Sequence, residues 1–145
     1  VVKKAYNSDD LISSGHILFK DGCIQIENTN ASLPQMLFDD YPIYDSIVFD
    51  VDGDGIDEVC VLGFGRTSGL FTFTFRAAEI GADTLKYDTL FCTEWYDLSF
   101  IRGDDGVVRV QGIDQKEPPQ THLFDIAVVD GSIQLTEDGQ SISRY

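Results

Sequence analysis

The sequence has no long apolar run and few basic residues. No stretch approaches the roughly 18 apolar residues that a membrane-spanning helix needs, and the first residues lack the charged-then-apolar order of a signal peptide. We therefore expect no membrane insertion of this segment. Ten bases stand against 25 acids, and the resulting formal charge of -15 repels phosphate backbones and anionic lipid surfaces. Nucleic acid is accordingly not expected as a partner.

Cysteine and histidine are also scarce. Cys23, Cys60 and Cys92 form none of the Cys-x-x-Cys or Cys–His spacings of a zinc site. Cys60 and Cys92 lie in apolar patterns where a thiol packs as a small hydrophobe, and one disulfide plus a free thiol is the alternative. His16 and His122 accompany no nucleophile motif, which favours structural roles. We therefore predict no catalytic residue and no enzyme, although paired carboxylates for glycoside hydrolysis depend on spatial separation that a sequence does not show.

What is present is the composition of one globular β domain. The 145 residues suit a single domain spanning 1–145, and 43% of them are hydrophobic. Period-two alternation and Asp-Gly turns predict hairpins at 17–26, 45–64, 100–110 and 126–135. We predict an all-β fold, or a mainly β fold with one or two short helices, in which about nine or ten short strands form an antiparallel meander. The meander should close into a barrel or pack as a sandwich, because a lone sheet would leave exposed edges.

Two segments depart from this pattern, and one segment is unusually aromatic. A capped helix is expected at 8–14. Residues 28–44 are expected to be irregular, except for a short helix that starts within 32–34 and ends at Asp39. Residues 70–76 alternate Phe with Thr, which predicts one buried face. The stretch 85–100 is apolar on both alternating faces when it is taken as one strand, with Tyr87 on one face and Phe100 on the other, which indicates a core strand.

The strongest chemical signal is the acidic loop at 50–58. Asp50, Asp52 and Asp54 occupy relative positions one, three and five, and Glu58 occupies position nine. Calcium takes six to eight oxygen ligands, and loops supply them by placing short acids at alternate positions. Ile56 at position seven would offer its backbone carbonyl, while Asp57 should point away from the ion.

The run from Phe49 to Gly63 resembles the acidic hairpin loops of FG-GAP and VCBS-type repeats, the integrin-like calcium modules. Their pattern is Asp-x-Asp/Asn-x-Asp-Gly-x-x-Asp/Glu followed by an apolar strand. The resemblance implies a calcium site, but it covers only this run. A full propeller is excluded because it needs several blades and no second copy of the loop occurs.

The ligand set predicts a weak, structural calcium site. Position twelve is Val61, whereas an EF-hand has a bidentate Glu there. We therefore expect a dissociation constant in the range of extracellular modules, about 10⁻⁴ to 10⁻³ M. The alternative is a bare turn, in which Asp and Gly serve only the backbone. Four converging carboxylates repel one another, however, and that repulsion favours a bound cation.

Two functional classes follow from the sequence. The first is a non-catalytic secreted or cell-surface module that presents its loops to a protein or glycan partner. Such a site fills with calcium outside the cell, so we expect an extracellular or cell-surface location, with a signal or lipoprotein-like anchor removed. The second class is a carbohydrate-binding or glycan-hydrolysing domain that uses Tyr87, Trp95 and Tyr96 as stacking platforms. The tripeptide Arg102-Gly103-Asp104 falls in a predicted turn, which explains its Gly and Asp.

Overall fold

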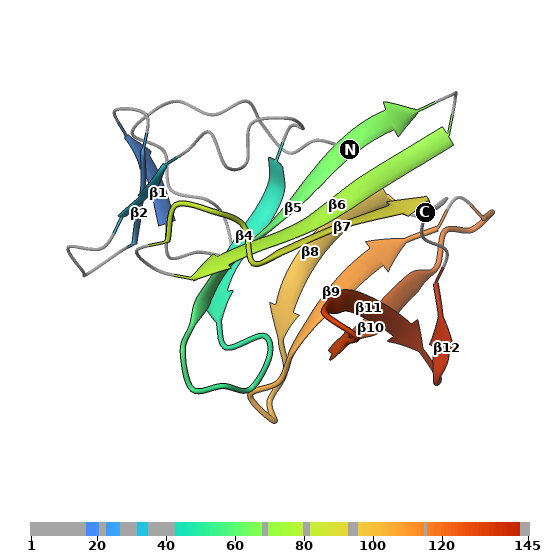
Figure 1. Cartoon of the computed structure of the whole chain (residues 1–145). Helices are drawn as coiled ribbons and strands as arrows, with labels where there is room; N and C mark the ends of the chain where they lie inside the picture. Colours follow the sequence, from blue (N-terminus) through green and yellow to red (C-terminus); the bar gives the residue numbers. More distant parts are fainter. Residues whose placement is uncertain are drawn as a thin grey trace.

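The computed structural model describes residues 17–20, 23–26, 32–34, 43–67, 70–79, 82–92, 96–114 and 116–142. All regular structure within these residues is β-strand, and every strand pairs antiparallel to its neighbours (Figure 1). The prediction of an all-β meander is therefore confirmed. Among the described residues, no helix has the length and apolarity to cross a membrane.

Nine strands form two meandering sheets. The first sheet has the order β4 (Ile43–Phe49), β5 (Glu58–Thr67), β6 (Leu70–Glu79) and β7 (Tyr87–Cys92). The second sheet runs in space from β12 (Gln140–Ser141) through β11 (Ser132–Glu137), β10 (Thr121–Val129) and β9 (Val108–Ile113) to β8 (Tyr96–Arg102). Three short strands, β1 (Ile17–Lys20), β2 (Cys23–Ile26) and β3 (Ser32–Pro34), make a third sheet.

The two larger sheets pack on one hydrophobic core and do not close into a barrel, an arrangement consistent with the predicted sandwich. Phe75 of β6 meets Phe100 of β8 edge to face, with ring centroids 5.5 Å apart. Along one seam, the buried Asp45 of β4 accepts a hydrogen bond from the backbone N–H of Phe100 at 2.9 Å. Along the other, Thr89 of β7 and Ser132 of β11 share a hydroxyl hydrogen bond. The β4–β5 loop lies at one end of the sandwich (Figure 1).

Within the described residues, the Asp-Gly turns form as the residue types predict. In the β10–β11 turn, Asp130 and Gly131 have φ values of 52° and 75°. Asp tolerates this left-handed region better than most residues and Gly adopts it freely. The β8–β9 turn contains the Arg-Gly-Asp tripeptide and closes through the Gly106 N–H, which donates to the Gly103 carbonyl at 2.9 Å. A Cβ at Gly103 would lie 2.8 Å from Oδ1 of Asp105, so the folded turn leaves little room for a larger residue at this position of the tripeptide.

The prediction of a short helix starting at residues 32–34 was wrong. Residues 32–34 are the strand β3 and not the start of a helix, because they pair with β2, with Leu33 opposite Ile24. Pro34 ends that strand, where a missing N–H is tolerated. The expected irregular segment 28–44 therefore contains β3 and the first residues of β4. The expected helix at 8–14 lies outside the described residues.

The aromatic stretch 85–100 is two strands and not one. β7 and β8 belong to different sheets, so the face pattern restarts between them. As a result Tyr87 and Phe91 of β7 and Leu98 and Phe100 of β8 all point into the same core. Their assignment to the core was correct, and their assignment to opposite faces of one strand was wrong. The side chains of Trp95 and Tyr96 lie outside the described residues.

Candidate metal centre

The loop between β4 and β5 is folded around the side chain of Asp50. One oxygen of this carboxylate accepts the backbone N–H groups of Gly53 at 2.9 Å and Asp54 at 3.2 Å, and the other accepts that of Gly55 at 2.7 Å. Gly53 and Gly55 have φ values of 76° and 87°, a region that L side chains rarely adopt. The sequence thus fixes the loop's shape through one acid and two glycines.

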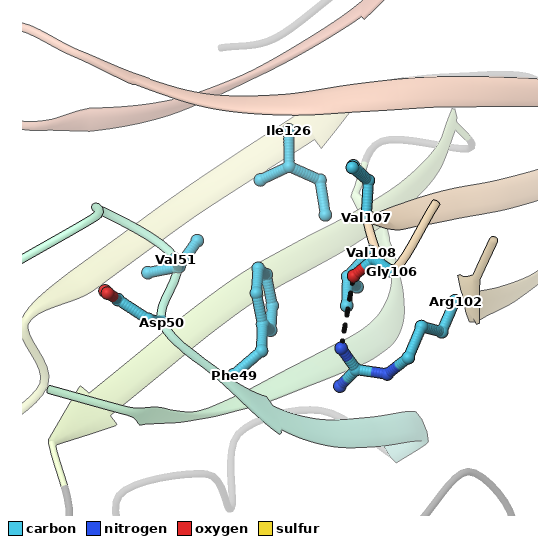
Figure 2. Close-up of a pocket in the computed structure, with 8 residues that line it drawn as sticks. All are labelled: Phe49, Asp50, Val51, Arg102, Gly106, Val107, Val108 and Ile126. Atoms are coloured by element: carbon cyan, nitrogen blue, oxygen red, sulfur yellow. Dashed lines mark hydrogen bonds between the residues drawn. The ribbon is translucent and has the colours of Figure 1, made fainter. Parts of the chain in front are cut away.

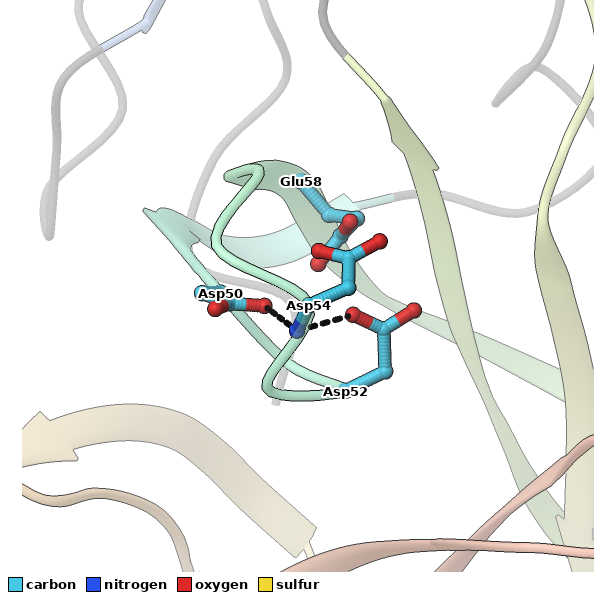
Figure 3. A group of neighbouring side chains, drawn as sticks. All are labelled: Asp50, Asp52, Asp54 and Glu58. Atoms are coloured by element: carbon cyan, nitrogen blue, oxygen red, sulfur yellow. Dashed lines mark hydrogen bonds between the residues drawn. The ribbon is translucent and has the colours of Figure 1, made fainter.

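This shape brings the four predicted carboxylates together. One oxygen from each of Asp50, Asp52, Asp54 and Glu58 lies within 4.8 Å of the others (Figure 3). Three of these residues come from the loop, and Glu58 is the first residue of β5. A group of carboxylate oxygens at this spacing could hold a metal ion, since such ions gather oxygens at short range. The geometry does not identify the metal.

Glu58 is the residue that distinguishes this loop from an ordinary acidic turn. Its side chain is completely buried. One carboxylate oxygen, Oε1, accepts the backbone N–H of Val51 at 2.9 Å, while Oε2 has no hydrogen-bond partner. Burial is the main cause that raises the pKa of Glu58, and the neighbouring Asp52 adds to it. A buried carboxylate oxygen without a hydrogen bond is costly unless a cation faces it.

A lysine from another part of the sheet reaches into the carboxylates. Lys86, next to the start of β7, places its Nζ 2.6 Å from Oδ2 of Asp52 and 3.0 Å from Oδ2 of Asp54. The same ammonium lies 3.6 Å from Oε2 of Glu58 and 3.7 Å from Oε1 of Glu79. Its hydrogen bond to Asp52 is the largest cause of a raised pKa of Lys86 and of a lowered pKa of Asp52.

Tyr87 supports the loop from the core. Its ring is buried, and its hydroxyl donates a hydrogen bond to Oδ2 of Asp52 at 2.8 Å. Burial, followed by this contact with Asp52, raises the pKa of Tyr87 to about 12. A buried ring with its hydroxyl committed to a carboxylate cannot act as a stacking platform for a sugar.

The charges of the centre do not balance. Four carboxylates within 4.8 Å face the single ammonium of Lys86, which leaves three formal negative charges uncompensated. Carboxylates at this range repel one another. A divalent cation would offset most of this charge and would give Oε2 of Glu58 a closer partner than the Lys86 ammonium, which lies 3.6 Å away.

The structure brings the four acidic residues of the predicted metal site together, and it does not test the fifth predicted ligand, the carbonyl of Ile56. The four acids form the cluster, and Asp57 is exposed and outside it. Ile56 has an exposed side chain, and its N–H donates to Oδ1 of Asp54 at 2.8 Å. The role of its carbonyl as a ligand stays a prediction. Sequence reasoning missed Lys86, and it named Tyr87 only as a core residue or a stacking platform, because both residues are far from the loop along the chain.

A pocket of about 350 Å³ borders the loop (Figure 2). It lies between the start of the loop, at Asp50 and Val51, and the β8–β9 turn, where Val107 is 46% exposed. Arg102 also lines it and donates from Nη1 to the carbonyl of Gly106 at 3.3 Å. The remaining lining is apolar, from Phe49, Val108 and Ile126.

A second polar cluster lies elsewhere on the second sheet. His122 of β10 contacts Oδ2 of the buried Asp114 through Nε2 at 2.8 Å and Oε2 of Glu137 through Nδ1 at 2.6 Å. Asp114 also accepts the backbone N–H groups of Lys116 and Gln120. The cluster ties the β9–β10 connection to the sheet, which agrees with the structural role expected for His122. His16 lies outside the described residues.

Cys60 is the cysteine whose side chain the structure describes. It is free and fully buried among core residues, as the apolar pattern around it predicts. Burial is the main cause that raises the pKa of its thiol, so the thiolate is disfavoured. The side chains of Cys23 and Cys92 lie outside the described residues.

Comparison with known proteins identified no similar protein. No family model, curated protein or solved structure matches the chain. The function is therefore inferred from the geometry of the acidic loop and its surroundings.

Proposed function

We propose that the chain is a non-catalytic secreted or cell-surface β module in which one weakly bound calcium ion stabilises the β4–β5 loop. The observation that supports the ion is Oε2 of Glu58, which is buried, has no hydrogen bond and faces the other carboxylates of the loop. Burying a carboxylate oxygen that accepts no hydrogen bond costs free energy, and the ammonium of Lys86, 3.6 Å from this oxygen, is beyond hydrogen-bond distance. A bound cation removes that cost.

Calcium is the ion that this ligand set favours. All four side chains supply carboxylate oxygens, whereas structural zinc prefers sulfur and nitrogen. Magnesium demands a tight octahedron and keeps its waters, which suits a loop of converging carboxylates less well. The carbonyl of Ile56 would complete the set. Affinity in the range of extracellular modules, about 10⁻⁴ to 10⁻³ M, keeps such a site filled outside a cell.

A binding role is supported by what lies beside the loop. The pocket beside the loop is lined by apolar side chains such as Phe49 and Ile126 and by the polar groups of Asp50 and Arg102, and a mixed surface of this kind offers contacts to a ligand or partner. A calcium-stiffened loop would hold one wall of this pocket in place. The partner would be a protein or a glycan. The committed hydroxyl of Tyr87 removes one of the three aromatic residues on which the glycan-stacking alternative depends.

The test of the calcium site is a melting curve with chelator, calcium or magnesium. If the dissociation constant is about 0.1 mM, about 2 mM calcium stabilises the fold by roughly 1.8 kcal/mol. That should raise the melting temperature by several degrees, because about 1 kcal/mol corresponds to roughly 2 to 4 °C at this size. The double variant Asp52→Ala with Asp54→Ala should lose the response.

A matched control removes two acids outside the loop. Asp83→Ala with Asp104→Ala deletes the same charge from exposed residues and should keep the calcium response. An unchanged melting temperature of the native chain up to about 10 mM calcium, well above the expected affinity range, would contradict the proposal.

A further inference from the structure

Lys86 occupies the position of a built-in cation at the candidate metal centre. Its backbone is fixed, because its N–H donates to the carbonyl of Ala77 at 2.8 Å. From this fixed point its side chain reaches carboxylates that are more than 25 residues away in sequence, with Nζ 2.6 Å from Asp52 and 3.0 Å from Asp54. The ammonium is 3.6 Å from Oε2 of Glu58, the buried oxygen that has no hydrogen bond.

We propose that Lys86 is a tethered counter-ion that competes with the metal for these carboxylates, so that binding of the metal releases the ammonium. This inference rests on the proposed calcium site. A calcium ion needs carboxylate oxygens at about 2.3 to 2.6 Å, and oxygens of Asp52 and Asp54 are the ones that contact Nζ. Two cations that share the same oxygens would lie within a few ångströms of each other and repel strongly.

The release has a defined route. Glu79, at the end of β6, places Oε1 3.7 Å from Nζ and lies outside the four-carboxylate group. Its side chain is 34% exposed, so an ammonium that leaves Asp52 and Asp54 can pair with Glu79 near solvent. The negative charge of the loop is therefore partly neutralised in both states, by Lys86 without calcium and by the ion when calcium is bound. Calcium then replaces one cation with another of higher charge, and Lys86 sets the calcium concentration at which this exchange occurs.

The first experiment compares calcium affinity by calorimetric titration. Lys86→Met removes the competing charge but keeps an aliphatic stem of similar length, and it should bind calcium about tenfold more tightly than the native chain, the gain expected when several partly exposed ion pairs need not be broken. Lys116→Met is the matched control, because Lys116 is an exposed lysine on the β9–β10 connection. It should leave the affinity within about twofold, since remote exposed charges are screened by salt.

The second experiment uses the native chain and needs no variant. Modification of lysine amines by a small acylating reagent, followed by mass spectrometry, reports how accessible each ammonium is. Addition of calcium should increase modification of Lys86 severalfold and leave Lys116 unchanged. Magnesium at the same concentration should have a smaller effect.

The outcomes separate the two proposals. If calcium binds the native chain and Lys86→Met equally well, and Lys86 modification ignores calcium, the counter-ion proposal is overturned and the calcium site stands. If calcium binds neither protein, both fail, and Lys86 is the permanent cation of an acidic turn. If calcium binds Lys86→Met but not the native chain, the competition is confirmed in its strongest form.

Discussion

Replacing Glu58 with Gln should change stability in a way that depends on calcium. The variant keeps the size of the side chain and an oxygen that can accept the N–H of Val51, and it removes the negative charge of a fully buried group. It also places amide N–H donors where Oε2 now lies, facing the carboxylates of Asp52 and Asp54. This substitution therefore relieves the repulsion between residue 58 and the other carboxylates, and it also removes a proposed ligand of the metal.

The two effects have opposite signs. In chelator, Glu58→Gln should be more stable than the native chain by about 1 to 2 kcal/mol, because an unsatisfied buried polar group costs about 1 to 3 kcal/mol. In calcium, the native chain gains roughly 1.8 kcal/mol at 2 mM for a dissociation constant of 0.1 mM. A tenfold loss of affinity in the variant reduces that gain to about 0.6 kcal/mol. The advantage of the variant should therefore shrink by about 1.2 kcal/mol.

The assay is urea denaturation of both proteins in chelator and in calcium. Measuring the four free energies of unfolding isolates the coupling between Glu58 and the ion, because any effect of the substitution on the rest of the fold cancels. Glu117→Gln is the control, since Glu117 is exposed and lies outside the cluster of four. An equal calcium gain in native chain and Glu58→Gln would refute the role of Glu58 as a ligand.

Three further predictions follow from the packing and the charges. Tyr87→Phe should lower the free energy of unfolding by about 0.5 to 1.5 kcal/mol, the usual contribution of a hydrogen bond, because Asp52 loses a donor. Urea denaturation measures this change, and an unchanged free energy would mean that the hydrogen bond does not stabilise the fold. Phe75→Ala should cost about 3 to 5 kcal/mol as a buried large-to-small change, whereas Val129→Ala, at a 43% exposed position, should cost far less, and equal losses would contradict the assigned core. The raised folded pKa of His122 means that its contribution is complete below its unfolded pKa, about 6.5, and is lost as pH rises through the folded value. Between pH 6 and 8.5 the native melting temperature should therefore fall by more than that of His122→Gln; parallel curves would contradict this.

Asp114, the acidic partner of His122, sets the lower pH limit of the stabilisation that this pair provides. The hydrogen bond from His122 is the main cause that lowers the pKa of Asp114 to about 2. A lowered acid pKa gives stability that is present above the unfolded value, about 3.9, and is lost as pH falls toward 2. The cluster of His122, Asp114 and Glu137 should therefore stabilise the fold most between about pH 4 and 6.5.

Local signals in the sequence predicted what depends on local geometry. Asp130-Gly131 adopts the left-handed turn that its residue types favour. The spacing of Asp50, Asp52, Asp54 and Glu58 was enough to predict that their carboxylates meet, because neighbours along one tight loop have few alternatives.

Contacts between distant segments were not predictable in the same way. Lys86 and Tyr87 reach Asp52 only because the meander pairs the start of β7 with the end of β6, which in turn pairs with the start of β5 next to the loop. The division of this stretch into β7 and β8 was missed, because both strands are apolar and no Gly or Pro lies between them. β3 was taken for a helix start, because Ser and Pro at 32–34 match a capping pattern while the pairing with β2 is a tertiary effect.

The most direct test of the calcium site is long-wavelength diffraction from crystals grown in about 10 mM calcium, a concentration above the expected affinity range. The account predicts one anomalous peak with oxygens of Asp50, Asp52, Asp54 and Glu58, and the carbonyl of Ile56, at about 2.3 to 2.6 Å. In the same map the ammonium of Lys86 should have left Asp52. No peak in the loop, with Lys86 still 2.6 Å from Asp52, would contradict the account.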